Sequence, residues 1–267
     1  MNLTVALIGL VIGTFIGISG VGGGSLMTPL LILFLRVHPV IAVGTDLVYN
    51  LPTKLVGSLV HARNQTVDRR LVQVLVAGGI PGAFAGLAIA AYARRHFSLA
   101  SLDAIVRHAV GAALIVSAVA LVIGIFARRG VRDGSQALDA TTPAPALSWT
   151  RAKHIQIGLL GAFVGTVVSI TSIGSGAITL PALYALLPRL GLRRIVGSDI
   201  AFATLLLLVA AVGNFLLGNV DFQLAGNLLI GSLPGVVLGS YLCRFLPENV
   251  LRPALAGILI FAGLRLV

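Results

Sequence analysis

Long apolar segments that carry almost no charge cover most of this chain, and no other feature restricts its fold as strongly. Of the 267 residues, 57% are hydrophobic and only 10% are charged. A soluble domain carries about 45–50% apolar and about 25% charged residues, so this chain has too few charges to cover a soluble globule. The composition therefore predicts an all-α, polytopic membrane protein and argues against soluble enzymes, secreted disulfide scaffolds and nucleic-acid-binding modules.

The apolar segments form two groups, separated by a polar stretch at residues 128–153. Each group begins with an interrupted segment and continues with three others, and each is long enough to span a bilayer as a helix. We therefore predict a first transmembrane repeat at 1–127, a linker at 128–153 and a second transmembrane repeat at 154–267. The segments cover 3–35, 41–62, 70–93, 104–127, 154–188, 194–217, 223–243 and 250–266.

Matching motifs indicate that the second group repeats the first. Val-Gly-Thr-Asp-Leu at 43–47 returns 153 residues later as Val-Gly-Ser-Asp-Ile at 196–200. Duplicated halves built from apolar helices are typical of transporter folds. The same separation of 153 residues links Val-Asp at 67–68 and 220–221, and Pro-Gly at 81–82 and 234–235.

The distribution of basic residues predicts that the two repeats are inverted. If residues 3–35 cross the membrane once, the basic residues divide evenly between the two sides. If these residues enter and leave on the same side, 13 basic residues share the side of the linker and five lie opposite. An excess of this kind marks the cytoplasmic side, so we assign the net charge of +11 to membrane orientation rather than to nucleic-acid binding.

This reasoning predicts two inverted repeats, each a Gly-rich broken or re-entrant helical hairpin plus three transmembrane helices. Both termini then lie outside the cell, and the linker at 128–153 is cytoplasmic. Residues 25–35 would form a helix of only about 16 Å, which is half of a bilayer core. The sequence leaves open whether the first part of each hairpin crosses the membrane fully.

A glycine-rich segment precedes a short apolar helix in each half, at 19–25 and at 171–176. Non-helical backbone inside a membrane must be buried in protein or line a polar cavity, and the N-terminus of a helix attracts anions. The alternative is that the small residues serve close helix packing. The residues predicted to bind an anion are Ser19, Gly20, Gly22, Gly23, Gly24, Ser25, Thr171, Ser172, Gly174, Ser175 and Gly176.

Ionisable residues inside predicted spans form the second group of candidates. Lys54 lies mid-span, where a charge is costly and by default indicates a pathway or coupling site; it could instead pair with Asp46 or reach towards the interface. Asn50 is one turn from both residues and could bind either. Asp46, Asp199 and His61 are candidates for ion or proton coupling, although the aspartates could cap helices and His61 could belong to a loop.

The sequence gives no indication of a cofactor or a metal. Cys243 stands alone in an apolar segment, so it belongs to no disulfide or metal-ligand pattern. An intramembrane enzyme would need a nucleophile with a base, or a set of metal ligands, and Asp46, Asp199 and His61 form no recognisable cluster. We therefore expect a protein that is not an enzyme.

Several of these motifs together resemble the sulfite exporter TauE/SafE family, membrane transporters of the toluene-sulfonate uptake permease type. The resemblance covers residues 5–127 and 155–266 and leaves the linker unmatched. The second half departs from the pattern because Asn214 stands where the first half has His61. The motifs are the repeated glycine-rich hairpin, the two Val-Gly-Thr/Ser-Asp motifs, the spacing from His61 to Val-Asp at 67–68, and Pro-Gly-Ala at 81–83 followed by Gly86.

The resemblance implies a permease of the bacterial inner membrane for sulfite, organosulfonates or related small anions. We expect an ion- or proton-coupled secondary transporter that works by alternating access, with the anion held by the glycine segments and Lys54. A passive anion channel and a transporter of another small anion, such as a carboxylate, remain alternatives. The expected partners are a small anionic substrate and the lipid bilayer, and a homodimer is compatible with the sequence.

Overall fold

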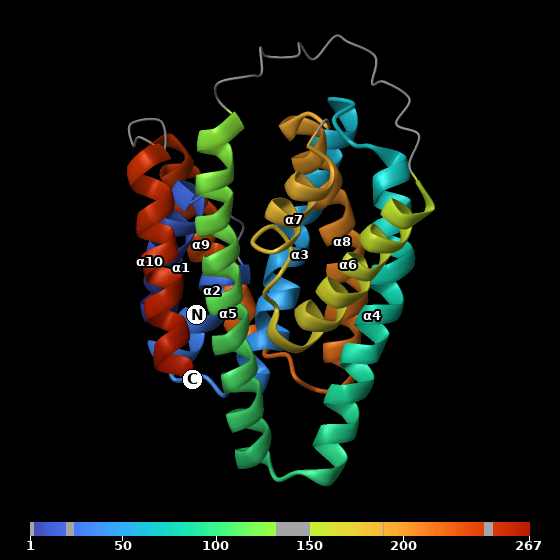
Figure 1. Cartoon of the computed structure of the whole chain (residues 1–267). Helices are drawn as coiled ribbons and strands as arrows, with labels where there is room; N and C mark the ends of the chain where they lie inside the picture. The colour runs from blue at the N-terminus through green and yellow to red at the C-terminus, as the bar shows by residue number, and fades with distance from the viewer. Residues whose placement is uncertain (1–2, 20–23, 132–149, 189, 243–247) are drawn as a thin grey trace.

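The computed structural model describes residues 3–19, 24–131, 150–188, 190–242 and 248–267. Within these ranges every regular element is an α-helix, so the all-α prediction is confirmed (Figure 1). The ten helices are α1 (Leu3–Ser19), α2 (Gly24–Leu33), α3 (Pro39–Arg63), α4 (Arg69–His96), α5 (Leu99–Val131), α6 (Arg151–Thr171), α7 (Thr179–Leu186), α8 (Leu192–Leu216), α9 (Phe222–Leu242) and α10 (Glu248–Leu266).

Five of these helices are long and apolar enough to cross a membrane. In the stretch within α8, 61% of the residues are buried, against 28–39% in the other four. The outer helices instead expose large apolar side chains such as Phe84, Leu159 and Leu233, as expected for surfaces that face lipid. The five stretches are Arg69–His96, Leu99–Val122, Arg151–Thr171, Arg193–Leu216 and Phe222–Gly239.

Helix α3 matches the span predicted at 41–62 but is absent from those five stretches. Its 25 residues are long enough to cross a membrane. They include Asp46, Asn50 and Lys54, which lower the apolar content of the helix. Since α3 packs against α8, a helix with polar residues in its span lies against the most buried of the five apolar stretches.

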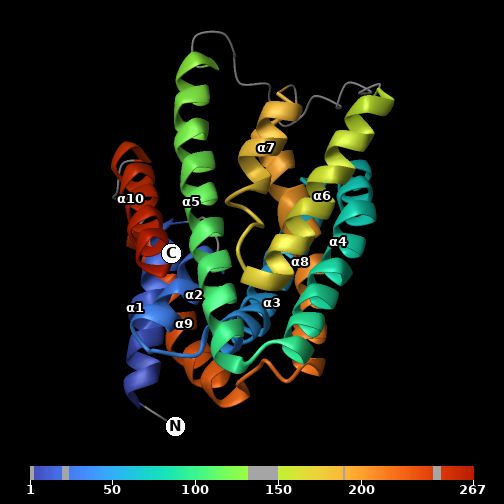
Figure 2. The ribbon, with the colours of Figure 1, turned by 60° about the horizontal axis from the view of Figure 1, so that its bottom comes forward.

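Helices α1 to α5 and helices α6 to α10 make matching contacts: if α1 is equated with α6, α2 with α7 and so on, the main contacts have counterparts. Helix α1 packs against α9, and its equivalent α6 packs against α4. Likewise α2 packs on α3 and α7 packs on α8, while α3 with α8 and α5 with α10 are contacts between equivalents. Figures 1 and 2 both place α6 beside α4 and α10 beside α5. The two groups of helices are therefore interlaced.

Glycines allow these crossing helices to touch backbone to backbone. A Cβ atom on Gly82 of α4 would lie 2.1 Å from the carbonyl oxygen of Ala162 in α6. The equivalent contact has a Cβ on Gly235 of α9 at 2.3 Å from the carbonyl oxygen of Leu10 in α1. Neither position has room for a side chain, so the repeated Pro-Gly pair serves close helix packing.

A non-helical connection separates the two parts of the interrupted segment in the second group. Helix α6 ends at Thr171 and α7 begins at Thr179. Between them, Gly174 and Gly176 have φ angles of 142° and 90°, a region that favours glycine. In the first group α1 ends at Ser19 and α2 begins at Gly24, with 20–23 outside the described residues.

The ends of the predicted linker are helical. Helix α5 continues to Val131 and α6 begins at Arg151, so each helix takes a few residues from the stretch predicted at 128–153. Hydropathy predicts where a helix leaves the lipid, but the backbone hydrogen bonds of the helix can continue beyond that point. The helix ends therefore differ from the ends of the apolar segments. Residues 132–149 lie outside the described part of the chain.

Candidate functional site

The two Val-Gly-Thr/Ser-Asp motifs lie in α3 and α8, which pack directly against each other. The hydroxyl residue of each motif holds the start of another helix. Thr45 Oγ1 accepts a hydrogen bond from the backbone N–H of Asp221 at 3.1 Å, and Ser198 Oγ accepts one from Asp68 at 2.8 Å. Both aspartate side chains in turn accept from backbone N–H groups in the first turn of α4 or α9, as helix caps do.

The glycine of each motif lies against the same turn as the hydroxyl residue. A Cβ on Gly44 would come within 2.1 Å of the carbonyl oxygen of Asn219, and one on Gly197 within 2.6 Å of that of Thr66. Asn219 and Thr66 are themselves 153 residues apart. Two residues of each motif therefore fix α3 and α8 in the fold, and only the aspartate is left for a different role.

The carboxylate of Asp46 is fully buried and accepts hydrogen bonds from three side chains. Oδ2 accepts from Thr28 Oγ1 at 2.6 Å and from Ser172 Oγ at 2.8 Å. Oδ1 accepts from Asn50 Nδ2, one turn later in α3, at 2.6 Å. Burying a carboxylate is costly unless hydrogen bonds replace its water, and here both oxygens have donors. Since Ser172 ends α6, this cluster joins the two groups of helices.

Asp199 is the equivalent residue in α8 and has different surroundings. It is also buried, yet its Oδ1 has no hydrogen-bond partner among the described residues. The ammonium of Lys54 interacts with it electrostatically, although the two groups form no direct ion pair. The backbone N–H of Gly176 lies near the same carboxylate, as does Thr179, whose hydroxyl donates to the carbonyl of Gly174 at 3.2 Å.

Lys54 lies in α3, and its side chain is half-buried. Its backbone carbonyl accepts a hydrogen bond from Thr204 Oγ1 of α8 at 3.0 Å, which fixes this turn of α3 against α8. One turn earlier, Oδ1 of Asn50 is buried without a partner. Among the described residues, Asn50 and Asp199 thus each have an oxygen with unused hydrogen-bonding capacity, and the role predicted for Lys54 and Asn50 stays a prediction.

His61 has a local hydrogen-bonding partner. Its Nδ1 lies 2.8 Å from Thr66 Oγ1, in the turn between α3 and α4. In the equivalent turn Asn214 Oδ1 accepts from Asn219 Nδ2 at 3.0 Å. His61 is 15 residues after Asp46, about 22 Å along the helix axis. The structure therefore places Asn50 beside Asp46 within α3, and Lys54 of α3 near Asp199 of α8, but leaves His61 outside both groups.

Only part of the predicted glycine-segment site can be described. Gly20, Gly22 and Gly23 lie outside the described residues, while Ser19 ends α1 and Gly24 begins α2. Ser25 is buried, and its hydroxyl has no partner among the described residues.

In the second segment the hydroxyls of two residues are already used. Ser172 donates to Asp46, and Thr171 donates to the carbonyls of Val167 and Ile173. Ser172 has a φ angle of 60° where α6 ends, which an L-residue adopts only at some cost. Gly174, Ser175 and Gly176 continue the connection towards α7, where Gly176 faces Asp199.

The structure adds three hydroxyl residues that the sequence analysis missed: Thr28, Thr179 and Thr204. Each is a single threonine in an apolar helix, and such residues commonly bond to their own backbone. Thr28 and Thr179 belong to the short helices that follow the two glycine segments, and this position is the signal that could have identified them. Thr204 lies five residues after Asp199 and carries no comparable signal.

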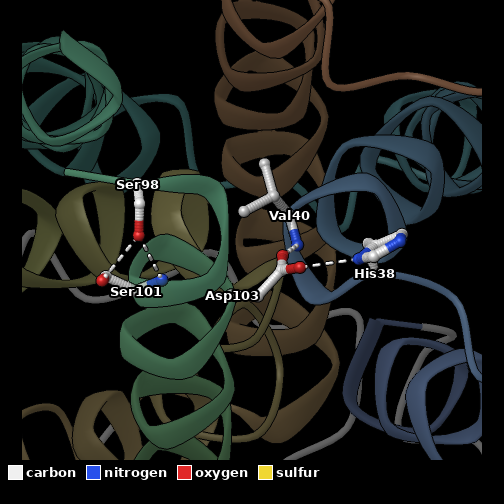
Figure 3. Close-up of polar contacts among 5 residues, drawn as sticks. All are labelled: His38, Val40, Ser98, Ser101 and Asp103. Carbon is white, nitrogen blue, oxygen red and sulfur yellow. Dashed lines mark hydrogen bonds and ion pairs between the residues drawn. The ribbon is translucent and has the colours of Figure 1, made fainter.

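A separate polar cluster lies where α2, α3 and α5 meet. His38 Nδ1 is 2.7 Å from Asp103 Oδ2, and the backbone N–H of Val40 is 3.5 Å from Asp103 Oδ1 (Figure 3). His38 and Asp103 border an open cavity of about 360 Å³, which Arg36 and Arg107 also line. Asp103 thus supports the start of α3 from α5.

The described residues contain no group of three or more histidine, cysteine or acidic side chains placed to hold a metal. Cys243 lies outside the described residues. The chemistry available around α3 and α8 is thus that of a half-buried ammonium, two buried carboxylates and hydroxyl or amide groups. Such a site can bind an anion and a proton.

Comparison with known protein families decides the class of this protein. The family model described as sulfite exporter TauE/SafE matches residues 5–266. The chain belongs to this family. Because the match runs through both groups of helices, it includes the interface of α3 and α8 and every described residue of the candidate site.

Two relatives from Bacillus subtilis (strain 168) support the family assignment. The probable membrane transporter protein YjnA is 38% identical over 270 residues, covering all of both chains. The probable membrane transporter protein YunE is 27% identical over 232 residues, covering 82% of this chain and 80% of the relative. No solved structure matches this chain. This TauE/SafE family member is thus a multi-pass membrane transporter, in line with its apolar helices.

Proposed function

We propose that this TauE/SafE protein is a secondary transporter that carries small sulfur-containing anions, such as sulfite or organosulfonates, across the bacterial cytoplasmic membrane. The observation that carries the proposal is Lys54, a half-buried cation on α3 that interacts with Asp199 of α8. It lies 15 residues after the start of α3 and nine before its end, about 22 and 13 Å along the axis. Charges placed this far inside a membrane helix mark substrate or ion pathways.

The anion would bind between Lys54 and the connection from α6 to α7. Gly176 directs its backbone N–H towards this region, and the N-terminus of α7 adds a partial positive charge. The buried hydroxyl of Ser25, which has no partner among the described residues, is proposed as a further donor. The remaining proposed ligands are Ser19, Gly20, Gly22, Gly23, Gly24, Asn50, Thr171, Ser172, Gly174 and Ser175, with Asp46, Asp199 and His61 as candidates for ion or proton coupling.

The alternating access that we propose needs two units that move against each other, and the helix contacts suggest which helices form them. Helices α1, α2, α3 and α9 pack together, and so do their equivalents α6, α7, α8 and α4. Each unit thus combines helices from both inverted repeats. The units meet where α3 packs on α8, with Lys54 of α3 and Asp199 of α8 at that contact. Movement there would expose the proposed site to one side of the membrane at a time.

The proposed orientation puts both termini outside the cell and the linker in the cytoplasm. Two observations support inverted repeats: equivalent helices exchange contacts, and in Figure 1 α5 ends at the top whereas its equivalent α10 ends at the bottom. Cysteine labelling with an impermeant reagent in intact cells tests this orientation. Phe97→Cys, between α4 and α5, should be labelled and Gln65→Cys, between α3 and α4, should not; the opposite pattern would refute it.

Flux measurements in liposomes test the transport function. Replacing Lys54 by Ala should lower sulfite and ethanesulfonate flux about 10- to 100-fold, because a hydrogen bond to a charged group contributes about 1.5–3 kcal/mol. The matched control is Lys153→Ala, which removes the other lysine of the chain, near the start of α6, and should leave flux unchanged. Equal flux in Lys54→Ala and the wild type would rule out this site.

A passive anion channel could use the same residues, and the substrate could be another small anion such as a carboxylate. Flux that saturates with concentration and responds to a pH gradient indicates coupled transport, whereas a channel shows neither behaviour. Competition of acetate with ethanesulfonate separates the substrate classes. Stronger inhibition by acetate than by sulfite would assign the site to carboxylates.

A further inference from the structure

We propose that Asp199 and the substrate anion compete for the positive charge of Lys54, so that each anion binds together with one proton on Asp199. This inference rests on the proposed transport function and deepens it by naming the coupling ion and the residue that carries it. It assigns different roles to the two equivalent aspartates, with Asp199 as the proton site and Asp46 as a fixed part of the α3 environment.

The geometry at the α3–α8 contact supports this competition. Asp199 is 1% exposed and its Oδ1 has no hydrogen-bond partner among the described residues. A buried carboxylate oxygen without a donor is costly, and a proton on that oxygen would remove the negative charge. Lys54 is the cation that interacts with this carboxylate, yet the two make no direct ion pair. The ammonium therefore retains hydrogens that an anion could accept.

Asp46 cannot perform the same exchange. Its two oxygens accept hydrogen bonds from Thr28, Ser172 and Asn50, all of which are neutral. The cation Lys54 has its electrostatic interaction with Asp199 and not with Asp46. A proton on Asp46 would therefore leave the charge available at Lys54 unchanged, so it could not couple protonation to anion binding.

The other charged groups near α8 stand at helix ends. Helix α8 packs against α3, α4, α6 and α7. On α4 and α6 the charged residues belong to the first and last turns, and α7 carries none. On α3 the remaining titratable groups are Asp46, Tyr49, His61 and Arg63, while α8 itself has Arg193 and Arg194 at its start. Lys54 is thus the charged group that responds directly to the protonation of Asp199.

The charge balance defines the exchange step. With Asp199 ionised, its negative charge offsets that of Lys54, so the empty site is neutral. A proton from the aqueous side converts the carboxylate to a carboxylic acid, and the freed ammonium then binds one anion. The loaded site is again neutral for a monovalent anion, and both neutral states avoid the high cost of an isolated charge in a low-dielectric region. Release of the anion and the proton on the other side restores the first state.

Binding experiments on the purified full-length protein test this exchange. The primary probe is ethanesulfonate, whose sulfonate group stays ionised throughout the pH range used. Calorimetry in buffers of different ionisation enthalpy should show uptake of about one proton per anion bound. On the alkaline side its affinity should fall about tenfold per pH unit, because the free protein must first bind a proton.

Two variants separate the roles of the residues. Asp199→Asn should bind ethanesulfonate with an affinity that no longer changes with pH and without proton uptake, since its amide mimics the protonated acid. Asp221→Asn is the matched control, because Asp221 is an exposed cap of α9 and asparagine caps helices equally well; it should keep the behaviour of the wild type. The wild-type proton count needs no variant and tests the inference even if Asp199→Asn does not fold.

The outcomes distinguish the inference from the function on which it rests. Binding of ethanesulfonate by the wild type without proton uptake, or with unchanged pH dependence in Asp199→Asn, would overturn the exchange and leave the transport function standing. Binding that requires sodium in place of a proton would also overturn it. Failure of the wild type to bind ethanesulfonate, sulfite or thiosulfate would overturn the proposed function and the inference together.

Discussion

The motif regions of α3 and α8 have nearly the same sequence and the same backbone contacts, yet their aspartates differ. In both, the glycine touches the turn before α9 or α4, and the hydroxyl accepts a backbone hydrogen bond from that turn. Asp46 accepts three side-chain hydrogen bonds, whereas Asp199 has an oxygen without a partner and faces Lys54. Equivalent positions thus provide one satisfied carboxylate and one that is poorly satisfied.

This difference comes from the residues around each aspartate and not from the motif itself. The positions equivalent to Asn50 and Lys54 in α8 are Ala203 and Leu207, 153 residues later. Helix α3 therefore supplies both the amide that stabilises Asp46 and the cation that faces Asp199. The sequence difference between the two matching segments places these polar groups on α3, which also explains why α3 is less apolar than α8.

The largest effect that we expect is a difference in unfolding free energy between the variants Asp46→Asn and Asp199→Asn. An amide at position 46 removes the charged acceptor of three donors and keeps only one of the two oxygens that now accept. The variant should lose about 2–3 kcal/mol of unfolding free energy. Asp199→Asn opposes no donor at Oδ1 but removes the charge that offsets Lys54, so it should lose less than Asp46→Asn once a saturating anion such as ethanesulfonate neutralises Lys54. Unfolding of the protein in mixed micelles by added SDS measures both values.

Two smaller substitutions serve as controls for the Asp46 cluster. Thr28→Val and Ser172→Gly each remove one donor to Oδ2, and Ser172→Gly also relieves the φ angle of 60°. Each should cost less than Asp46→Asn, and the glycine variant should cost less than the valine variant. Equal losses in Asp46→Asn and Asp199→Asn would show that the two carboxylates do not differ as described.

The next effect tests the contact that both halves share. Gly44→Ala would bring a methyl group within 2.1 Å of a backbone oxygen, and Gly197→Ala within 2.6 Å. Both variants should lose about 1–3 kcal/mol through forced backbone shifts, with the larger loss at Gly44. Gly158→Ala is the control, since nothing lies within 4 Å of its added Cβ. A neutral Gly44→Ala would mean that the glycine of the motif does not fix α3.

The sequence was sufficient to predict the helical class and the family, because hydropathy and motif spacing are local properties. It also singled out Asp46, Asn50, Lys54 and Asp199 as candidates, since polar residues are rare in apolar segments, and their roles stay predictions. It could not predict which partners these residues have. Thr28 and Ser172 reach Asp46 from other helices, and only the packing of α2 and α6 on α3 creates those hydrogen bonds.

The smallest expected effect concerns the hydroxyls of the two motifs. Removing either hydroxyl should lower the unfolding free energy by the same amount. Thr45→Val and Ser198→Ala each leave one backbone N–H, of Asp221 or Asp68, without its acceptor. Hydrogen bonds in membrane proteins contribute about 0.6 kcal/mol on average, so each variant should lose about this amount in the same SDS titration. Because the contacts are equivalent, the two losses should agree within error even where the aspartate variants differ. A clear difference between them would extend the asymmetry from the aspartates to the framework that holds them.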